Sequence, residues 1–306
     1  MADLREDAGM RDPSWAARLE GVVSPGIRDK TVAVVGCGSV GSFIADELCR
    51  SGVSRFILID PDTVEWVNLT RTVFGYRDVG AFKVQALARH LHEIFPDVRI
   101  DAHPAELQGL REEMPQIFVG VDLVIAAVDD PKANGMLDRF CYELGLRTLF
   151  VGIYKGARGG EVVAVDPSCT PCYGCATGGV RESVADVIDR KEVVRERDYG
   201  TNKLVAEVAL GSDIHFVCTA GVKMALSLLC RDNDALPLKA FMQSQLDEGV
   251  HYAMFGMQPD YYLFPSTHGD AIGQHAFQSL WLKTTRRADC PRCGDADERI
   301  SFLSDG

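Results

Sequence analysis

The sequence is short of positive charge. Its 306 residues contain 32 Lys and Arg against 44 Asp and Glu, which gives a formal net charge of −12 at pH 7. General binding to nucleic acids or to anionic membranes needs a basic surface, so neither is expected as a general partner. The remaining composition, with 46% hydrophobic and 25% charged residues, is that of an ordinary globular protein.

Long apolar runs are missing as well. The N-terminal stretch Met1–Pro13 is polar, so we expect no signal peptide. The most apolar stretch, residues 214–230, contains His215 and Lys223 and is short for a bilayer span, so we expect a buried helix there. The sequence also contains no internal repeats or low-complexity tract. We therefore expect a cytosolic protein that does not associate with membranes.

A secretory signal is absent, and this changes what the ten cysteines indicate. Four of them form two close pairs, Cys172/Cys175 and Cys290/Cys293, a pattern that favours metal binding over disulfides in such a chain. Four thiolates close a tetrahedral shell with no open position. We therefore expect structural Zn²⁺ that ties the C-terminal part to the body.

Strand-like and helix-like segments alternate through the first half of the chain. Buried strands are predicted at 32–35 and 55–60 and within 98–107, 121–130 and 147–154, with helices following residue 39, at about 81–95 and around 136–145. This order predicts the α/β class with a doubly wound, mostly parallel, Rossmann-like sheet. After Tyr154 the stretch "KGARGGEVVAVDP" indicates a glycine-rich turn between antiparallel strands.

These patterns divide the chain into three parts. Residues 1–30 form an N-terminal helical segment with the short amphipathic stretch "WAARLEGVV", and residues 31–165 form the nucleotide-binding domain. Residues 166–306 form an antiparallel, zinc-bearing and partner-recognition part. It includes a crossover at about 176–210, whose charged stretch 181–203 is either a solvated helix or loop or a mobile flap over a site.

The segment "GCGSVG" places Gly36, Gly38 and Gly41 in a GxGxxG arrangement between a strand and a helix. Small residues let phosphates approach the backbone, and the helix N-terminus presents unpaired N–H groups to them. Ser39 opens that helix, and Asp60 follows the next strand, where a carboxylate can bind ribose hydroxyls. With Asp62 nearby, these residues predict a nucleotide site.

Asn68, Arg71 and Lys83 follow the ribose acid at offsets of 8, 11 and 23 residues. A dinucleotide dehydrogenase has no need of these cations, whereas nucleotidyl transfer builds negative charge at the α-phosphate and on the departing pyrophosphate. Asp129 ends a predicted strand, at the sheet edge where such folds bind ligands, and a carboxylate there can hold the Mg²⁺ of ATP. Asp130 precedes Pro131 and is expected to cap a helix.

Four segments, "GCGSVGS", "ILIDPDTVEWVNLTR", "DVGAFK" and "AAVDD", resemble the ThiF/MoeB-type adenylyltransferases, which are related to ubiquitin-activating enzymes. The resemblance covers about residues 25–175 and the C-terminal cysteine pair. It implies that Asp60 binds the ATP ribose, that Asn68, Arg71 and Lys83 contact phosphates, and that Asp129 holds Mg²⁺.

The same resemblance implies adenylation of the C-terminal carboxylate of a small β-grasp protein ending in Gly-Gly, by a homodimer. It also implies a zinc site built by CxxC pairs as widely separated as these, which lie 114 residues apart. An arginine from the partner subunit's N-terminal segment often enters the site in this family, and Arg11 and Arg18 are the candidates here.

The chain departs from this family at three points. Asp130 stands where relatives have Asn, and Asn134 stands where an arginine is common. No cysteine occurs between residues 176 and 217, where relatives that form a thioester place their nucleophile. Cys218 falls at core spacing in a helix, so transfer without a thioester on this chain is favoured.

Several alternatives stay open from the sequence. They are a nicotinamide-dependent oxidoreductase, a non-catalytic subunit of a heterodimeric activating enzyme, a tRNA-modifying relative, and an enzyme that adenylates a ribosomal peptide. The stretch 154–161, "YKGARGGE", either lines a groove for a peptide tail or is an ordinary hairpin turn. Residues 231–280 predict only a mixed, aromatic-containing region that recognises the partner.

Overall fold

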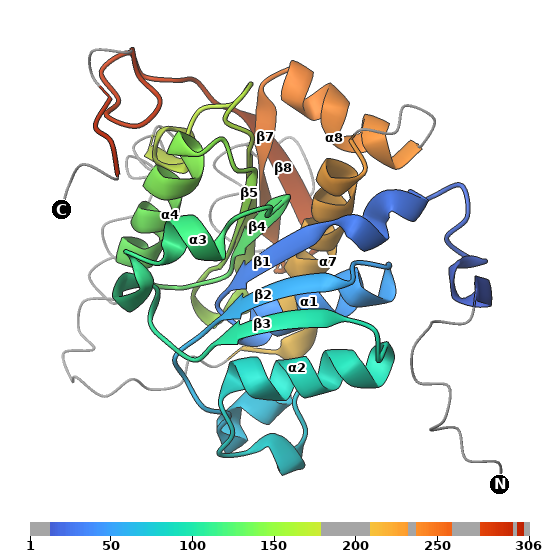
Figure 1. Cartoon of the computed structure of the whole chain (residues 1–306). Coiled ribbons are helices and arrows are strands. Elements are labelled where there is room, and N and C mark those ends of the chain that lie inside the picture. Colours follow the sequence, from blue (N-terminus) through green and yellow to red (C-terminus); the bar gives the residue numbers. More distant parts are fainter. Residues whose placement is uncertain (1–12, 179–208, 232–236, 259–275, 296–298, 303–306) are drawn as a thin grey trace, which may run out of the picture.

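The computed structural model describes residues 13–178, 209–231, 237–258, 276–295 and 299–302. Its centre is a single sheet of eight strands in the order β3-β2-β1-β4-β5-β6-β7-β8 (Figure 1). Strands β1 to β5 are parallel, whereas β6, β7 and β8 are antiparallel to their neighbours. The predicted fold class is therefore confirmed. The strands are β1 Thr31–Val35, β2 Arg55–Ile59, β3 Arg99–His103, β4 Leu123–Ala126, β5 Thr148–Ile153, β6 Gly159–Val165, β7 Val250–Gly256 and β8 Gln278–Lys283.

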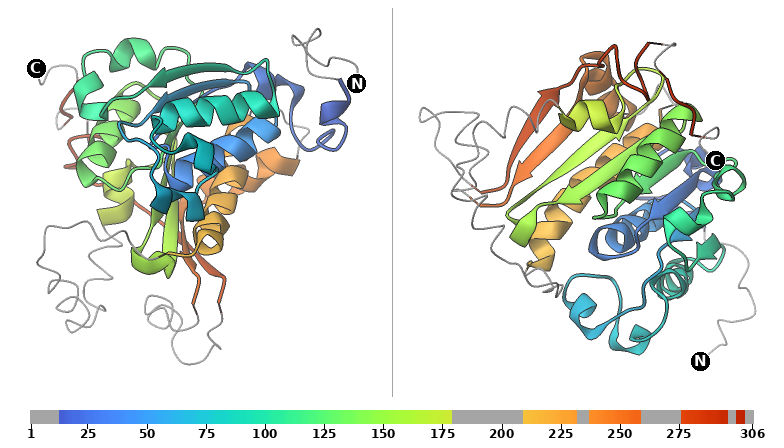
Figure 2. Two further views of the ribbon diagram at one scale, coloured as in Figure 1. Left: turned by 90° about the horizontal axis from the view of Figure 1, so that it is seen from below. Right: turned by 90° about the vertical axis from the view of Figure 1, so that its left-hand side faces the viewer.

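The C-terminal strands do not form a sheet of their own. β6 pairs with β5 and β7 pairs with β6, so the antiparallel strands extend the parallel sheet, as the right-hand view of Figure 2 shows. The hairpin between β5 and β6 contains the short 3-10 helix η6, Lys155–Ala157, which confirms the glycine-rich turn expected there.

Helices cover both faces of the sheet (Figures 1 and 2). Because side chains alternate along a strand, Val32 and Val34 face one core and Ala33 and Val35 the other. The first core is covered by α1, α2, α7 and α8, and the second by α3 and α4. The helices are α1 Ser39–Arg50, α2 Lys83–Ile94, α3 Met114–Ile117, α4 Pro131–Glu143, α7 Gly211–Leu229 and α8 Pro237–Asp247, and the further 3-10 helices are η1 Pro13–Ala16, η2 Pro25–Asp29, η3 Trp66–Thr70, η4 Tyr76–Asp78 and η5 Leu107–Leu110.

Two local expectations can be compared directly with these elements. In α2, Val84, Leu87 and Leu91 are buried, which confirms the predicted amphipathic helix. The stretch "WAARLEGVV" forms the end of η1 and turns instead of a longer helix. Trp15 nevertheless anchors this segment, since its ring packs edge-on against Phe95 with centroids 5.5 Å apart.

Helix α7 is the buried helix expected around residues 214–230. Among the described helices it alone has the length and composition to cross a bilayer, but 61% of that apolar window is buried inside the fold. It packs against α1, β5 and β6, as the core helix of a globular domain does. The predicted flap at 181–203 lies outside the described residues, as do residues 259–275 of the region whose role was left open.

Candidate active site

The glycine loop joins β1 to α1 and closes against the end of β4. Gly36 has φ +90°, and a Cβ built on it would lie 2.3 Å from the Ala127 carbonyl oxygen. A Cβ on Gly41 would lie 1.8 Å from the Gly36 carbonyl oxygen. Gly38, by contrast, has open space beside it. The first and third glycines therefore fold the loop tightly, and the second leaves room for a ligand at the N-terminus of α1.

Asp60, directly after β2, is held in a fixed position. Its two carboxylate oxygens accept hydrogen bonds from the backbone N–H groups of Cys37 at 2.7 Å and Asp62 at 2.9 Å. Burial raises the pKa of Asp60, and the positive charge of Lys83 works in the opposite direction. Lys83 Nζ lies 4.0 Å from Asp60 Oδ1 and 2.7 Å from Asp62 Oδ2. The predicted ribose acid and the predicted phosphate lysine thus share one site.

A cavity of about 420 Å³ lies over this loop, at the carboxyl end of the parallel strands. Much of its wall comes from the loop after β3 and the end of β4, namely from Glu106, Gln108 and Val128. Seven of the acidic, basic and glycine residues singled out in the sequence line it: Gly36, Gly38, Asp60, Asp62, Lys83, Asp129 and Asp130.

Asp129 lies at the mouth of this cavity, beyond the end of β4. Asp129 is exposed to solvent as a residue, although neighbouring protein atoms crowd its carboxyl group. This partial desolvation raises the pKa of Asp129, and the positive charges of Arg71 and Lys83 act against that rise. Mg²⁺ commonly binds one or two carboxylates together with substrate phosphates, so Asp129 fits the role of a magnesium ligand.

Arg71 is hydrogen-bonded to the first residue of α1. Its Nε donates a hydrogen bond to Ser39 Oγ at 2.9 Å, and His215 of α7 contacts its carbonyl oxygen at 3.3 Å. His215 also stacks on Phe43 of α1, with ring centroids 4.2 Å apart. Two helices, α1 and α7, therefore position this arginine beside the glycine loop, although it does not line the cavity.

Asn68 does not line the cavity either. Its Oδ1 accepts a hydrogen bond from the Glu65 backbone N–H at 2.8 Å, in a reciprocal capping arrangement at η3. In this conformation the side chain orders the loop that carries Arg71. The predicted phosphate contact of Asn68 stays a prediction.

Asp130 is the N-cap of α4. It accepts hydrogen bonds from the backbone N–H groups of Lys132 at 3.0 Å and Ala133 at 3.3 Å, which confirms the capping role expected from the sequence. Asn134 donates from Nδ2 to the Val128 carbonyl oxygen at 3.0 Å, and its Oδ1 is buried without a hydrogen-bond partner among the described residues. This short side chain ties α4 to the end of β4.

The four paired cysteines form one buried cluster. Their Sγ atoms all lie within 4.8 Å of one another, with Cys172–Cys290 at 3.7 Å and Cys175–Cys293 at 3.6 Å. A zinc ion with Zn–S bonds of about 2.3 Å in a tetrahedron needs sulfurs about 3.8 Å apart, so these side chains fit Zn²⁺. Gly294 permits the second turn, since a Cβ there would lie 2.4 Å from the Cys290 carbonyl oxygen.

A buried carboxylate joins the two CxxC turns to α4. Asp138 accepts hydrogen bonds from the backbone N–H groups of Tyr173 at 2.7 Å and Gly174 at 3.0 Å, both in the first turn. Its Oδ2 also lies 3.1 Å from Arg292 Nη1 in the second turn. Asp138 thus fixes both halves of the metal site on one helix, a role that the sequence did not reveal.

The buried cysteines outside this cluster are poorly suited to act as nucleophiles. Cys218 and Cys141 are buried, and burial raises the pKa of each thiol to about 12. Cys37, in the glycine loop, is also fully buried, and burial again raises its pKa. The expectation that Cys218 is a core residue is confirmed. Cys169 is exposed, beside the metal cluster.

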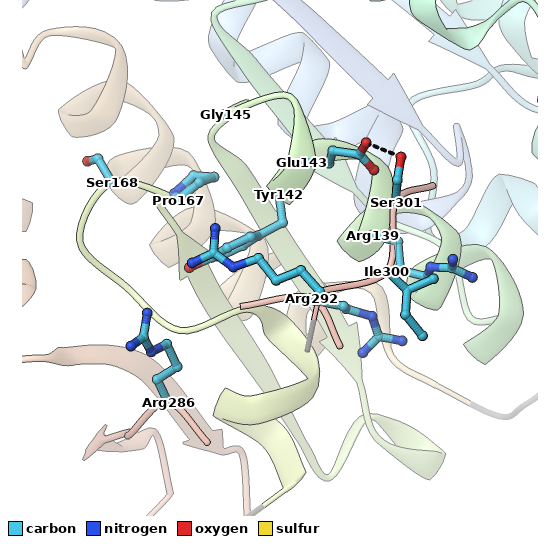
Figure 3. Close-up of a pocket in the computed structure, with 11 residues that line it drawn as sticks. Arg139, Tyr142, Glu143, Gly145, Pro167, Ser168, Arg286, Arg292, Ile300 and Ser301 are labelled. Atoms are coloured by element: carbon cyan, nitrogen blue, oxygen red, sulfur yellow. Dashed lines mark hydrogen bonds between the residues drawn. The ribbon is translucent and has the colours of Figure 1, made fainter. Parts of the chain in front are cut away.

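Two further cavities lie near the metal cluster. One, of about 370 Å³, shares Val128 and Asp129 with the nucleotide cavity and reaches Tyr154 and Glu161 of the β5–β6 hairpin region. The other, of about 550 Å³, is the largest of the three but contains none of the predicted site residues. It is lined by Arg139, Arg286, Arg292 and Arg299 (Figure 3).

The arginine-lined cavity belongs to the attachment of the C-terminal segment. Glu143 at the end of α4 accepts a hydrogen bond from Ser301 Oγ, drawn in Figure 3, and another from the Phe302 backbone N–H. Arg111 donates to the Phe302 carbonyl oxygen at 2.9 Å. The size of this cavity therefore does not mark it as the active site.

Residues 21–252 match the ThiF family. The chain belongs to the ThiF family. The match includes the glycine loop, Asp60, Lys83, Asp129 and the first cysteine pair.

Curated relatives include ubiquitin-like modifier-activating enzyme 5 of Drosophila ananassae, which is 38% identical over 180 residues covering 56% of this chain and 45% of the relative. The same enzyme of Culex quinquefasciatus is 37% identical over 180 residues, with 56% and 45% covered. The chain thus spans a little under half the length of the curated relatives it matches.

Solved structures with this fold include E. coli MccB with ATP, with a TM-score of 0.65 and 16% identity over 93% of this chain and 75% of that one. E. coli MccB with MccA-N7isoASN gives a TM-score of 0.63 and 18% identity over 88% of this chain and 68% of the other. At these identities the likeness supports the fold alone.

Proposed function

We propose that this chain catalyses the ATP- and Mg²⁺-dependent adenylation of the C-terminal carboxylate of a small ubiquitin-like protein. One observation carries the proposal: Asp129, with Arg71 and Lys83 close enough to affect its pKa, borders both the nucleotide cavity and the neighbouring cavity of about 370 Å³. A nucleotide in the first cavity and a carboxylate in the second would meet at this residue.

With the two substrates next to each other at Asp129, the reaction proceeds as follows. An oxygen of the substrate carboxylate attacks the α-phosphorus of ATP, the bond between the α- and β-phosphates breaks, and pyrophosphate leaves as the acyl-adenylate forms. Arg71 and Lys83 stabilise the negative charge that develops on the phosphate oxygens. Bound Mg²⁺, held by Asp129, would supply further stabilisation of the same charge.

The acyl group then passes to an acceptor outside this chain. The low reactivity of the buried thiols supports transfer without a thioester on the chain's own cysteines. We further propose that the enzyme works as a homodimer. Arg18, one of the two candidates for a cross-subunit arginine, is exposed, whereas Arg11 lies outside the described residues.

A ribosomal peptide is the alternative substrate. The solved structures of MccB include one with MccA-N7isoASN, and this likeness concerns the fold only. The relatives named ubiquitin-like modifier-activating enzyme 5 are considerably more similar in sequence, which favours a protein substrate.

The test is ATP–pyrophosphate exchange with Mg²⁺ against a panel of small proteins and peptides ending in Gly-Gly. Exchange should require a panel member and should fall at least about 100-fold in Asp129→Asn and Lys83→Met. Arg89→Met is the matched control, since Arg89 lies on the same helix α2 and pairs with Asp78 away from the cavity. NADH binding without ATP binding would instead identify an oxidoreductase.

A further inference from the structure

Glu161 of β6 carries a buried carboxylate, and the residue is only 6% exposed. Three phenols donate hydrogen bonds to it: Tyr154 to Oε2 at 2.7 Å, Tyr173 to Oε1 at 3.3 Å, and Tyr252 to Oε2. No Lys, Arg or His side chain in the described part of the chain forms an ion pair with it. A buried carboxylate of this kind is costly unless a donor or a cation compensates its charge.

The three tyrosines act as neutral donors. Burial and the nearby charge of Glu161 both raise the pKa of Tyr154 and of Tyr252, so both phenols keep their protons. They satisfy part of the hydrogen-bonding capacity of Glu161 but contribute no positive charge. Tyr173 is the most distant of the three donors, and its ring is fixed by stacking on Phe150 with centroids 4.1 Å apart.

Glu161 also faces the cavity that adjoins the nucleotide site. Arg292 of that lining pairs with the buried Asp138 at 3.1 Å. Asp129 is exposed to solvent, and the positive charges of Arg71 and Lys83 act on its carboxyl group. Of the two buried carboxylates in this lining, Asp138 has an ion pair and Glu161 has none among the described residues. A ligand with a positively charged group in this cavity would compensate the negative charge of Glu161.

The size of the cavity indicates where in a substrate that charge would lie. A volume of 370 Å³ corresponds to a sphere about 9 Å across. An extended chain advances about 3.3–3.6 Å per residue, so a tail whose terminal carboxylate lies at Asp129 places its second or third residue at the opposite wall. Gly135 in the lining leaves room for a main chain, since the nearest heavy atom to a Cβ built there would be Arg292 Nη2 at 3.9 Å.

We propose that Glu161, held by three tyrosines, binds a Lys or Arg side chain at the second or third position counted from the C-terminus of the substrate. The proposal rests on the proposed function, since it assigns a specificity-determining residue to the acyl side of the same site. The competing interpretation is that Glu161 only joins β6, β7 and the first CxxC turn. That structural role predicts no preference among substrates.

The test uses short peptides as probes, because it then does not depend on finding the natural substrate. Binding of a hexapeptide ending in Arg-Gly-Gly is compared by calorimetry with one ending in norleucine-Gly-Gly and with the C-terminal amide of the first. A non-hydrolysable ATP analogue and Mg²⁺ are present throughout. The wild-type protein should bind the Arg peptide about 10-fold more tightly than the norleucine peptide, and the amide should bind weakly.

Glu161→Gln should remove the preference for arginine while it leaves the melting temperature and the zinc content unchanged. Glu93→Gln is the matched control, since Glu93 is exposed on α2, far from this cavity, and it should retain the preference. Tyr173→Phe should also retain it, because the carboxylate remains.

A wild-type protein that binds both free-carboxylate peptides equally, or neither of them, would overturn the proposal, whether or not Glu161→Gln folds. An unchanged preference in a folded Glu161→Gln variant would overturn it as well. Arginine-dependent binding without any pyrophosphate exchange would leave this inference standing and would count against adenylation, so the two failures can be told apart.

Discussion

At the scale of single residues, His251 predicts how stability depends on pH. It is fully buried in β7, contacts the Ala164 carbonyl oxygen at 2.6 Å, and burial lowers its pKa from 6.5 to about 4. Below pH 6.5 the unfolded chain therefore binds a proton at this position that the folded chain does not. The free energy of unfolding should fall progressively between pH 6.5 and pH 4 by about 2–3 kcal/mol from this residue.

The measurement is urea unfolding at several pH values between 7.5 and 4.5. Carboxyls with raised pKa, such as Asp60 and Asp129, act in the opposite direction, so the difference between wild type and His251→Gln isolates the histidine. The advantage of the wild type over this variant should shrink as the pH falls. His92→Gln, at an exposed position of α2, should follow the wild type, and parallel curves for wild type and His251→Gln would refute the assignment.

At the scale of elements, two glycines of the glycine loop have different roles: Gly41 is needed for folding, and Gly38 leaves room for a ligand. Gly41→Ala should lower the free energy of unfolding by at least about 2 kcal/mol, because the new Cβ would collide with the Gly36 carbonyl oxygen. Gly38→Ala meets nothing within 4 Å and should melt like the wild type. Thermal unfolding of both variants checks this, and equal melting temperatures would contradict the observed loop geometry.

Local sequence patterns were sufficient to predict these elements. The apolar run before "GCGSVG" predicted β1, the spacing of Val84, Leu87 and Leu91 predicted α2, and Asp130-Pro131 predicted the start of α4. Each of these signals comes from neighbouring residues along the chain. The segment "WAARLEGVV" shows the limit, since its amphipathic pattern suggested a helix and the structure has η1 and turns.

Contacts between distant residues could not be predicted in the same way. Asp138 is an acidic residue in a helix, and only the fold brings it to both CxxC turns. Glu161 could have been noticed as an acid in an otherwise apolar strand, but its three tyrosines come from separate elements. The capping arrangement of Asn68 likewise depends on the local backbone conformation, which the motif does not specify.

At the scale of the whole molecule, one sheet connects the nucleotide site to the metal site. Asp60 and Asp129 follow parallel strands, whereas Glu161 and Tyr252 come from the antiparallel strands that extend the same sheet. The cavity beside the nucleotide site also contains Tyr173 and Arg292, which lie within the two CxxC turns. The turns that carry the four-cysteine cluster therefore form part of the wall of the cavity proposed to hold the substrate carboxylate, and loss of a metal bound there should affect more than the C-terminal segment.

Removal of the metal tests this connection. We expect about one zinc per chain, and we expect Cys290→Ser or treatment with a strong chelator to lower the free energy of unfolding by at least about 2 kcal/mol. Amide hydrogen exchange should rise first at residues 172–178 and 290–295, where the cluster holds the chain, and binding of ATP should weaken less than binding of a Gly-Gly peptide. Cys169→Ser is the matched control, because this exposed thiol adjoins the cluster without belonging to it. Full zinc content in Cys290→Ser would mean that these four sulfurs are not the ligands, and equal losses of ATP and peptide binding would mean that the metal supports the sheet as a whole rather than the acyl side.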